Sequence, residues 1–210
     1  MLEKLAKQTA VYGISTIAVR FLSYLLTPVF TRVFEPEAYG IVTDVYALIP
    51  FALVVLTMGL ESAYFRFAAK ADAAAAAAGG TEGEIAAQAR AGKRRLFATA
   101  WGVTLLAASL FFLLTAFGRE RVAEWMGEAY VAHPEYVLLV AAVVWFDVAA
   151  CLPFSRLREQ GRAMTFVGIK ALGVVVNVAL AIGFALAGLY GTPFGVGWVF
   201  VANLIASAVT

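Results

Sequence analysis

Charged side chains are scarce in this chain of 210 residues. They make up 14% of it, while hydrophobic residues make up 62%; soluble domains carry about 25% charged and about 45–50% apolar residues. A chain of this size cannot bury so much apolar surface within its own fold, which excludes a water-soluble globule. The net charge of +2 also excludes a strongly basic surface, so we expect no nucleic-acid partner.

Residues that bind metals or carry catalysis are equally few. The single cysteine, Cys151, excludes an internal disulfide and a cysteine-rich metal site, and its apolar surroundings predict a packing role. The single histidine, His133, precedes Pro134 in a predicted outer loop. There is no glycine-rich phosphate loop with its lysine, no His-Glu-x-x-His and no cysteine pair. We therefore predict no enzyme, no metal site and no bound cofactor.

Six long apolar runs fill most of the sequence. About 20 residues of helix cross a hydrocarbon core of about 30 Å. Backbone polar groups in lipid must be satisfied within such a segment, and no alternating barrel pattern is visible, so the runs predict helices. The predicted fold class is an all-α, polytopic membrane helical bundle. Its predicted transmembrane helices are residues 9–33, 42–67, 96–117, 136–154, 163–188 and 194–210.

Positive charges gather on alternate connections between these runs. Eleven of the 16 Lys and Arg lie before the first run or in and beside the connections after the second and fourth runs, whereas three lie in or beside the other connections. By the positive-inside rule the eleven face the cytoplasm. We therefore predict a multi-pass protein of the bacterial cytoplasmic (inner) membrane with a cytoplasmic N-terminus.

Two connecting segments have a distinct composition. Residues 71–92 contain a run of six alanines and Gly79-Gly80, which predicts a flexible cytoplasmic insert. In residues 119–130, three glutamates are spaced four residues apart. This spacing predicts an amphipathic helix that lies on the outer (non-cytoplasmic) surface of the same membrane. The prolines Pro28 and Pro50 predict kinks in the first two spans.

A charge inside lipid costs about 2.5–3.5 kcal/mol at a helix centre and therefore indicates function. Arg20 lies near the middle of the first run, on a polar face with helical spacing. We predict that this face lines a water-filled cavity; the alternative is that Arg20 is a structural ion-pair partner. The face consists of Gly13, Thr16, Arg20, Ser23, Thr27 and Thr31.

Four further charges are candidates for ion pairing or for coupling to an ion gradient. Asp147, near the centre of the fourth run, is the predicted partner of Arg20, and Asp44 is the alternative. Glu61 lies near the cytoplasmic end of its run, where we predict a local pair with Arg66. The fourth candidate is Lys170.

Lys170 lies two turns into the fifth run, from which its long side chain can reach the cytoplasmic interface. Asn177 and Asn203, in the last two runs, are predicted to form hydrogen bonds between helices.

Two stretches of the sequence resemble the bacterial oligosaccharide flippases of polysaccharide export. This family belongs to a superfamily that also holds the lipid II flippases and the multidrug and toxin extruders. The first stretch is YGISTIAVRFLSYLLTPVFTRVFEPEAYGIVTDVYALIPFALVVLTMGLESAYFRF, with a short loop ending in Tyr-Gly and a span closing on aromatic-Arg-aromatic. The second is LPFSRLREQGRAMTFVGIKALGVVVNVAL, where a span containing proline meets an arginine-rich turn.

The resemblance implies two lobes of six or seven helices, of which residues 1–210 would be the N-terminal lobe. The last run stops at Thr210 without a flanking charge, so we expect a C-terminal lobe of the same chain as a partner. The family's expected activity is export of polyprenyl-pyrophosphate-linked oligosaccharide by alternating access, with possible coupling to a Na⁺ or H⁺ gradient. The lipid bilayer is the other expected partner.

The resemblance also suggests which residues bind substrate. Arg20 precedes Arg32 by twelve residues, a spacing similar to that of a cavity arginine in the lipid II flippase; a second cavity arginine of that protein corresponds to Leu26. The predicted substrate-binding residues are Arg20, Thr16, Ser23 and Thr27. The alternatives are a cation-coupled multidrug exporter of the same superfamily, a membrane glycosyltransferase or ligase, and a non-transporting scaffold.

Overall fold

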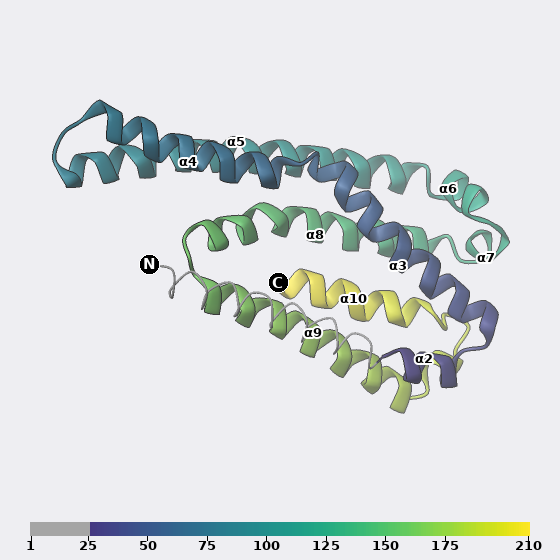
Figure 1. Ribbon diagram of the computed structural model, residues 1–210. Coiled ribbons are helices and arrows are strands. Elements are labelled where there is room, and N and C mark those ends of the chain that lie inside the picture. Colours follow the sequence, from purple (N-terminus) through teal and green to yellow (C-terminus); the bar gives the residue numbers. More distant parts are fainter. Residues whose placement is uncertain (1–25) are drawn as a thin grey trace.

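Helices account for nearly all of the computed structural model, which describes residues 26–210 (Figure 1). The predicted all-α class is confirmed for this part of the chain. The helices are α2 (Thr27–Val33), α3 (Pro36–Thr57), α4 (Leu60–Ala78), α5 (Glu82–Phe117), α6 (Arg119–Met126), α7 (Glu128–Val131), α8 (Glu135–Glu159), α9 (Ala163–Leu186), the short 3₁₀ helix η1 (Leu189–Gly191) and α10 (Gly197–Val209).

Four helical stretches are long and apolar enough to cross a membrane, which makes this a multi-pass membrane protein. They are Pro36–Ala78, Glu82–Phe117, Glu135–Glu159 and Ala163–Leu186. α10 is apolar but has 13 residues, fewer than the about 20 that cross a bilayer. The first predicted span, residues 9–33, lies mostly outside the described residues. The six-helix lobe therefore stays a prediction.

The second predicted span, residues 42–67, is divided between α3 and α4. The helix continues through Pro50 and ends at Thr57, and the next two residues have left-handed backbone, with φ of 49° at Met58 and 68° at Gly59. Two consecutive residues in this conformation redirect the chain, because a right-handed helix needs negative φ. The helix break therefore lies at Met58-Gly59, two turns beyond the predicted proline kink.

Residues 71–92 form regular helix where we expected an irregular insert. α4 and α5 continue through this segment and meet at a turn over residues 79–81, so that they lie side by side (Figure 1). Alanine is the best helix former, which favours helix in the six-alanine run. Thr81 begins α5 with a capping box, in which its backbone N–H donates to Glu84 Oε2 at 2.8 Å. The mobility expected of this segment stays a prediction.

The outer connection forms two short helices rather than the single one predicted over residues 119–130. Gly127 separates α6 from α7 with φ of 121°, a backbone conformation that only glycine adopts readily. Ala123 is buried against the bundle, whereas Trp125 is 82% exposed. An exposed tryptophan beside charged residues is typical of a membrane interface.

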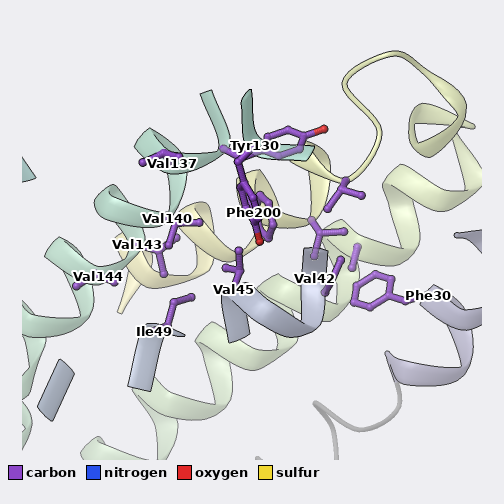
Figure 2. Packing of buried hydrophobic residues seen from close by; sticks show 14 of the residues in the cluster. Phe30, Val42, Val45, Ile49, Tyr130, Val137, Val140, Val143, Val144 and Phe200 are labelled. Atoms are coloured by element: carbon purple, nitrogen blue, oxygen red, sulfur yellow. The ribbon is translucent and has the colours of Figure 1, made fainter. Parts of the chain in front are cut away.

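The bundle is arranged in layers, with α10 between α8 and α9 and the α4–α5 hairpin on the far side of α8 (Figure 1). The apolar core lies where α3, α8 and α10 meet. Figure 2 shows Val45 and Ile49 of α3 close to Val140 and Val143 of α8, with Phe200 of α10 beside them. Membrane helices associate mainly through close packing of this kind. The hydrophobic effect does not drive their association, because lipid is as apolar as the side chains.

Two tryptophans attach α5 to α8. The indole N–H of Trp101 donates to the Ala149 carbonyl at 2.8 Å, and that of Trp145 donates to Ser109 Oγ at 3.1 Å. Each bond satisfies a polar group that would otherwise lie unpaired in an apolar setting. The two bonds are spaced along the α5–α8 interface and fix the register of these helices.

Ion pairs attach α4, α5 and α8 at one end of the bundle. Lys93 of α5 lies 2.7 Å from both Asp72 of α4 and Glu159 of α8. Glu61 of α4 pairs with Arg158 of α8. The predicted pair of Glu61 with Arg66 is therefore wrong. Five residues of helix turn through about 140°, so the two side chains leave α4 in different directions.

The same end of the bundle collects most of the described cations, as the charge pattern of the sequence predicted. Three cations lie at the opposite end, on α2 and α6, among a larger number of carboxylates. The cations of the basic end lie on α4, on the first turns of α5 and at the α8–α9 connection (Figure 1). These are Arg66, Lys70, Arg90, Lys93, Arg94, Arg95, Arg156, Arg158 and Arg162.

The helix break can be tested at Gly59. We expect Gly59→Ala to destabilise the protein by about 1 kcal/mol, because left-handed backbone costs alanine more free energy than glycine. Gly40→Ala is the matched control. Gly40 is inside α3 with open space around its added methyl group, so this change should stabilise by up to about 1 kcal/mol. Thermal unfolding in detergent measures both; equal shifts would contradict the assigned break.

Candidate functional site

A cavity of about 710 Å³ lies among α2, α3, α8, α9 and α10. Its volume falls within the range of about 300–1,000 Å³ that is typical of small-molecule sites. Its wall combines apolar groups with hydroxyl, amide and charged groups. The lining residues are Leu26, Thr27, Phe30, Tyr39, Val42, Thr43, Tyr46, Ile49, Pro50, Asp147, Lys170, Gly173, Val174, Asn177, Asn203, Ala206, Ser207 and Thr210.

Three helices each direct one polar stripe at this cavity. Residues three, four or seven apart lie on the same face of a helix, and the polar lining residues have these spacings. They are Tyr39, Thr43 and Tyr46 on α3, Lys170 and Asn177 on α9, and Asn203 and Ser207 on α10. Because the three stripes converge, polar side chains within a lipid-embedded bundle face one another rather than the hydrocarbon.

Small residues bring α9 and α10 together beside the cavity. A methyl group added at Gly173 of α9 would lie 2.4 Å from Thr210 Cγ2 and 3.6 Å from the Ala206 carbonyl. Glycine and alanine at such a contact let two helix backbones approach closely. The wall that carries Lys170, Asn203 and Ser207 is therefore set by direct packing of the two helices.

The charged groups of the cavity are Asp147 of α8 and Lys170 of α9. Ser207 of α10 lies close to the Asp147 carboxylate, and both residues line the cavity. The Asp147 and Lys170 charges attract each other, and the Lys170 ammonium also lies 4.2 Å from the ring centroid of Phe154. The negative face of an aromatic ring attracts an ammonium group. The cavity wall thus contains one basic and one acidic side chain.

Polar side chains of α3 and α9 approach each other across the cavity wall. Tyr46 and Asn177 are close neighbours there, while the hydrogen bond of Asn177 between helices stays a prediction. Asn203 also lines the cavity, on the neighbouring helix α10. An amide and a phenol at this depth supply donors and acceptors that water or a sugar hydroxyl can match.

The predicted site residues fall in different places. Thr27 lines the cavity, while Arg20, Thr16 and Ser23 lie outside the described residues. Substrate binding by all four therefore stays a prediction. Asp44 is exposed on another face of α3; burial and the nearby Asp44 charge together raise the pKa of Tyr130 to about 12.

Sequence reasoning missed the contributions of α3 and α10 to this cavity. Tyr39, Thr43 and Tyr46 form an i, i+4, i+7 stripe, and Asn203 and Ser207 are four apart. The same test of spacing that singled out the first run would have identified both stripes. Their members are uncharged, and it was the cost of charge in lipid that directed attention to other positions.

Long apolar helices surround a cavity whose wall includes polar and charged side chains, and they define the chain as a multi-pass membrane protein. A family model described as "Polysaccharide biosynthesis protein" matches residues 5–210. The chain belongs to this family, the flippases related to lipid II flippases and to multidrug and toxin extruders. The resemblance seen in the sequence is thereby confirmed. No curated protein and no solved structure matches the chain.

The cavity can be tested by the accessibility of introduced cysteines. In a Cys151→Ala background, we expect Thr43→Cys and Asn203→Cys to react with a membrane-impermeant charged thiol reagent about tenfold faster than Leu106→Cys, because a thiol reacts as its hydrated thiolate. Leu106 is the control, since it is 72% exposed on the apolar outer face of α5. Mass spectrometry of the labelled protein gives the rates. Similar rates at all three positions would show that water does not enter the cavity.

Proposed function

We propose that this protein exports lipid-linked (polyprenyl-pyrophosphate) oligosaccharide across the cytoplasmic membrane for surface polysaccharide synthesis. The observation that supports this most directly is the cavity itself, with polar and charged groups enclosed by apolar helices in a member of this family. A lipid-linked sugar has an apolar polyprenyl chain and a polar pyrophosphate-linked sugar. The polyprenyl chain can stay in the bilayer, whereas the sugar and pyrophosphate need a polar path.

Two cations would hold the pyrophosphate. Lys170 lines the cavity, and Arg20 is predicted to lie on the polar face that continues into Thr27. A guanidinium stays charged and offers forked donors to phosphate oxygens. The ammonium of Lys170 adds a point charge, which Asp147 partly balances when no substrate is bound. Hydroxyls of the stripes on α3 and α10 would hydrogen-bond the sugar.

Transport would follow from rocking of this lobe against a C-terminal lobe of the same chain, so that the cavity opens to each side in turn. The concentration of cations at one end of the bundle supports a cytoplasmic position for that end. The N-terminus would then be cytoplasmic and the membrane the inner one. Asp147 is the candidate to couple this motion to a Na⁺ or H⁺ gradient.

A cation-coupled multidrug exporter is the second candidate function. The carboxylate of Asp147 in the cavity wall favours it, since a buried anion attracts organic cations. In that case Asp147 would be the binding group, and Lys170 would oppose binding. The two candidates thus assign opposite roles to the two charges of one cavity.

The proposed phosphate role can be tested at Lys170 and Arg20 in the full-length protein. We expect Lys170→Met and Arg20→Ala each to lower surface polysaccharide about 10–100-fold at matched expression, because a charge-assisted hydrogen bond contributes about 1.5–3 kcal/mol. Arg20→Lys should retain part of the activity. Lys70→Met is the control, since Lys70 lies over Phe67 at the basic end, away from the cavity. Wild-type output from both cavity variants would end the proposal.

The choice between the two candidates depends on Asp147. We expect the wild-type protein to bind a polyprenyl pyrophosphate, and Asp147→Asn to bind it at least as tightly, because the change removes a negative charge near the phosphate. Fluorescence titration in detergent, with a cationic dye as the competing ligand, measures both affinities. Dye binding that Asp147→Asn abolishes, without any binding of the pyrophosphate, would favour the drug exporter.

A further inference from the structure

Three arginines on the third and fourth turns of α5 line an open hollow of about 500 Å³. The hollow is lined by Arg90, Arg94 and Arg95, with Ala91 and Ala98 between them. All three arginines are exposed, and within residues 26–210 none of them forms an ion pair. The neighbouring cation differs in this respect, because Lys93 faces the bundle and pairs with two carboxylates. The cluster therefore carries positive charge that no ion pair with another described residue balances.

The arginines lie at the edge of the apolar part of α5. Residues 96–117 contain no charged side chain, and at 1.5 Å per residue they span about 33 Å. This length matches a hydrocarbon core of about 30 Å. Arg94 and Arg95, directly before this segment, are therefore level with the lipid headgroups on the basic side of the membrane.

An apolar row continues from the arginines along the exposed surface of α5. Ala98 and Gly102 follow Arg94 at four-residue intervals, each step turning about 40° around the helix, and open space surrounds Gly102. Leu106, eleven residues or about three turns after Arg95, lies on the same face as that arginine, and Leu106 and Leu110 are both exposed in the bundle. The small residues that follow the arginines along α5 leave a shallow groove on its surface, and the leucines extend this groove toward the centre of the bilayer.

Arg90 and Arg94 are four residues apart on one helix, so their charges repel each other. An anion between them would remove that repulsion. A phosphate suits the position, because guanidinium groups bind its oxygens through paired N–H donors. Basic clusters at the cytoplasmic edge of a membrane helix attract anionic lipid headgroups in the same way.

We propose that Arg90, Arg94 and Arg95 bind the phosphate of an anionic phospholipid, whose acyl chain lies along Ala98, Gly102 and Leu106 of α5. The site is separate from the transport cavity, and it does not depend on the proposed export function. Its ligand is a component of the bilayer itself. Bound there, the lipid would hold the long α4–α5 hairpin at a fixed height in the membrane.

The experiment uses the full-length protein in a neutral detergent, with dioleoyl phosphatidylglycerol as the probe and dioleoyl phosphatidylcholine as the neutral comparison. Native mass spectrometry counts the bound lipids during a titration. We expect the wild type to bind phosphatidylglycerol preferentially, and each arginine changed to Gln to weaken binding about fivefold. Binding should also weaken as salt is raised.

Removing positive charge can disturb membrane topology, so a compensated variant is needed. Arg94→Gln/Arg95→Gln combined with Ala87→Lys/Gln88→Lys keeps the number of cations in this connection but moves two of them about 10 Å along α5. Arg121→Gln, on α6 at the opposite end, is the control for loss of one exposed arginine. The compensated variant should lose the preference for phosphatidylglycerol, and the control should keep it.

Two results would overturn the proposal. One is equal binding of the two lipids by the wild-type protein. The other is an unchanged preference for phosphatidylglycerol in the compensated variant, which would place the anionic lipid elsewhere on the surface. Surface polysaccharide is measured in the same variants. A variant that loses the lipid preference but keeps export shows that the lipid site acts independently of the cavity.

Discussion

The constraint on which this fold depends is the cost of leaving polar groups in hydrocarbon. Each long helix satisfies its own backbone, but its polar side chains still need partners. α3, α9 and α10 meet that need by turning their polar stripes toward one shared cavity. Ser207 lies beside Asp147, and Tyr46 lies beside Asn177. The apolar faces that remain, such as the leucines of α5, are left for lipid.

The same constraint divides the bundle into two functional parts. On one side of α8, tryptophan hydrogen bonds and ion pairs join α5 and α4 to it, with Lys93 bridging all three helices. On the other side, α9 and α10 carry the cavity wall and meet through small residues such as Gly173. Directional bonds fix a register, whereas smooth contacts between small side chains permit sliding. The contacts that join α4 and α5 to α8 are thus directional, whereas α9 and α10 meet through close packing of small residues.

Composition and charge pattern were enough to predict the helical class, the membrane location and the segregation of basic residues. They were enough because each depends on sums over many residues. The helix break at Met58-Gly59 depends on two backbone angles, and the sequence instead directed attention to Pro50. The pairing of Glu61 with Arg158 joins residues 97 positions apart, a contact that helix periodicity cannot anticipate. Helix in residues 71–92 agrees with the high helix propensity of alanine, whereas the expectation of a flexible insert rested on the alanine run together with Gly79-Gly80.

The cavity illustrates why the charged residues of such a site are predicted from a sequence more readily than the neutral ones. A charge such as Lys170 or Asp147 stands out because its burial is expensive. Tyr39, Thr43 and Ser207 carry no charge, and they become parts of a site only when their helices are placed together. Yet such neutral groups provide most of the polar lining, and a sugar is recognised mainly through neutral hydrogen bonds. Charges would therefore fix where the pyrophosphate binds, whereas the geometry of the bundle determines which hydroxyls and amides can meet the sugar.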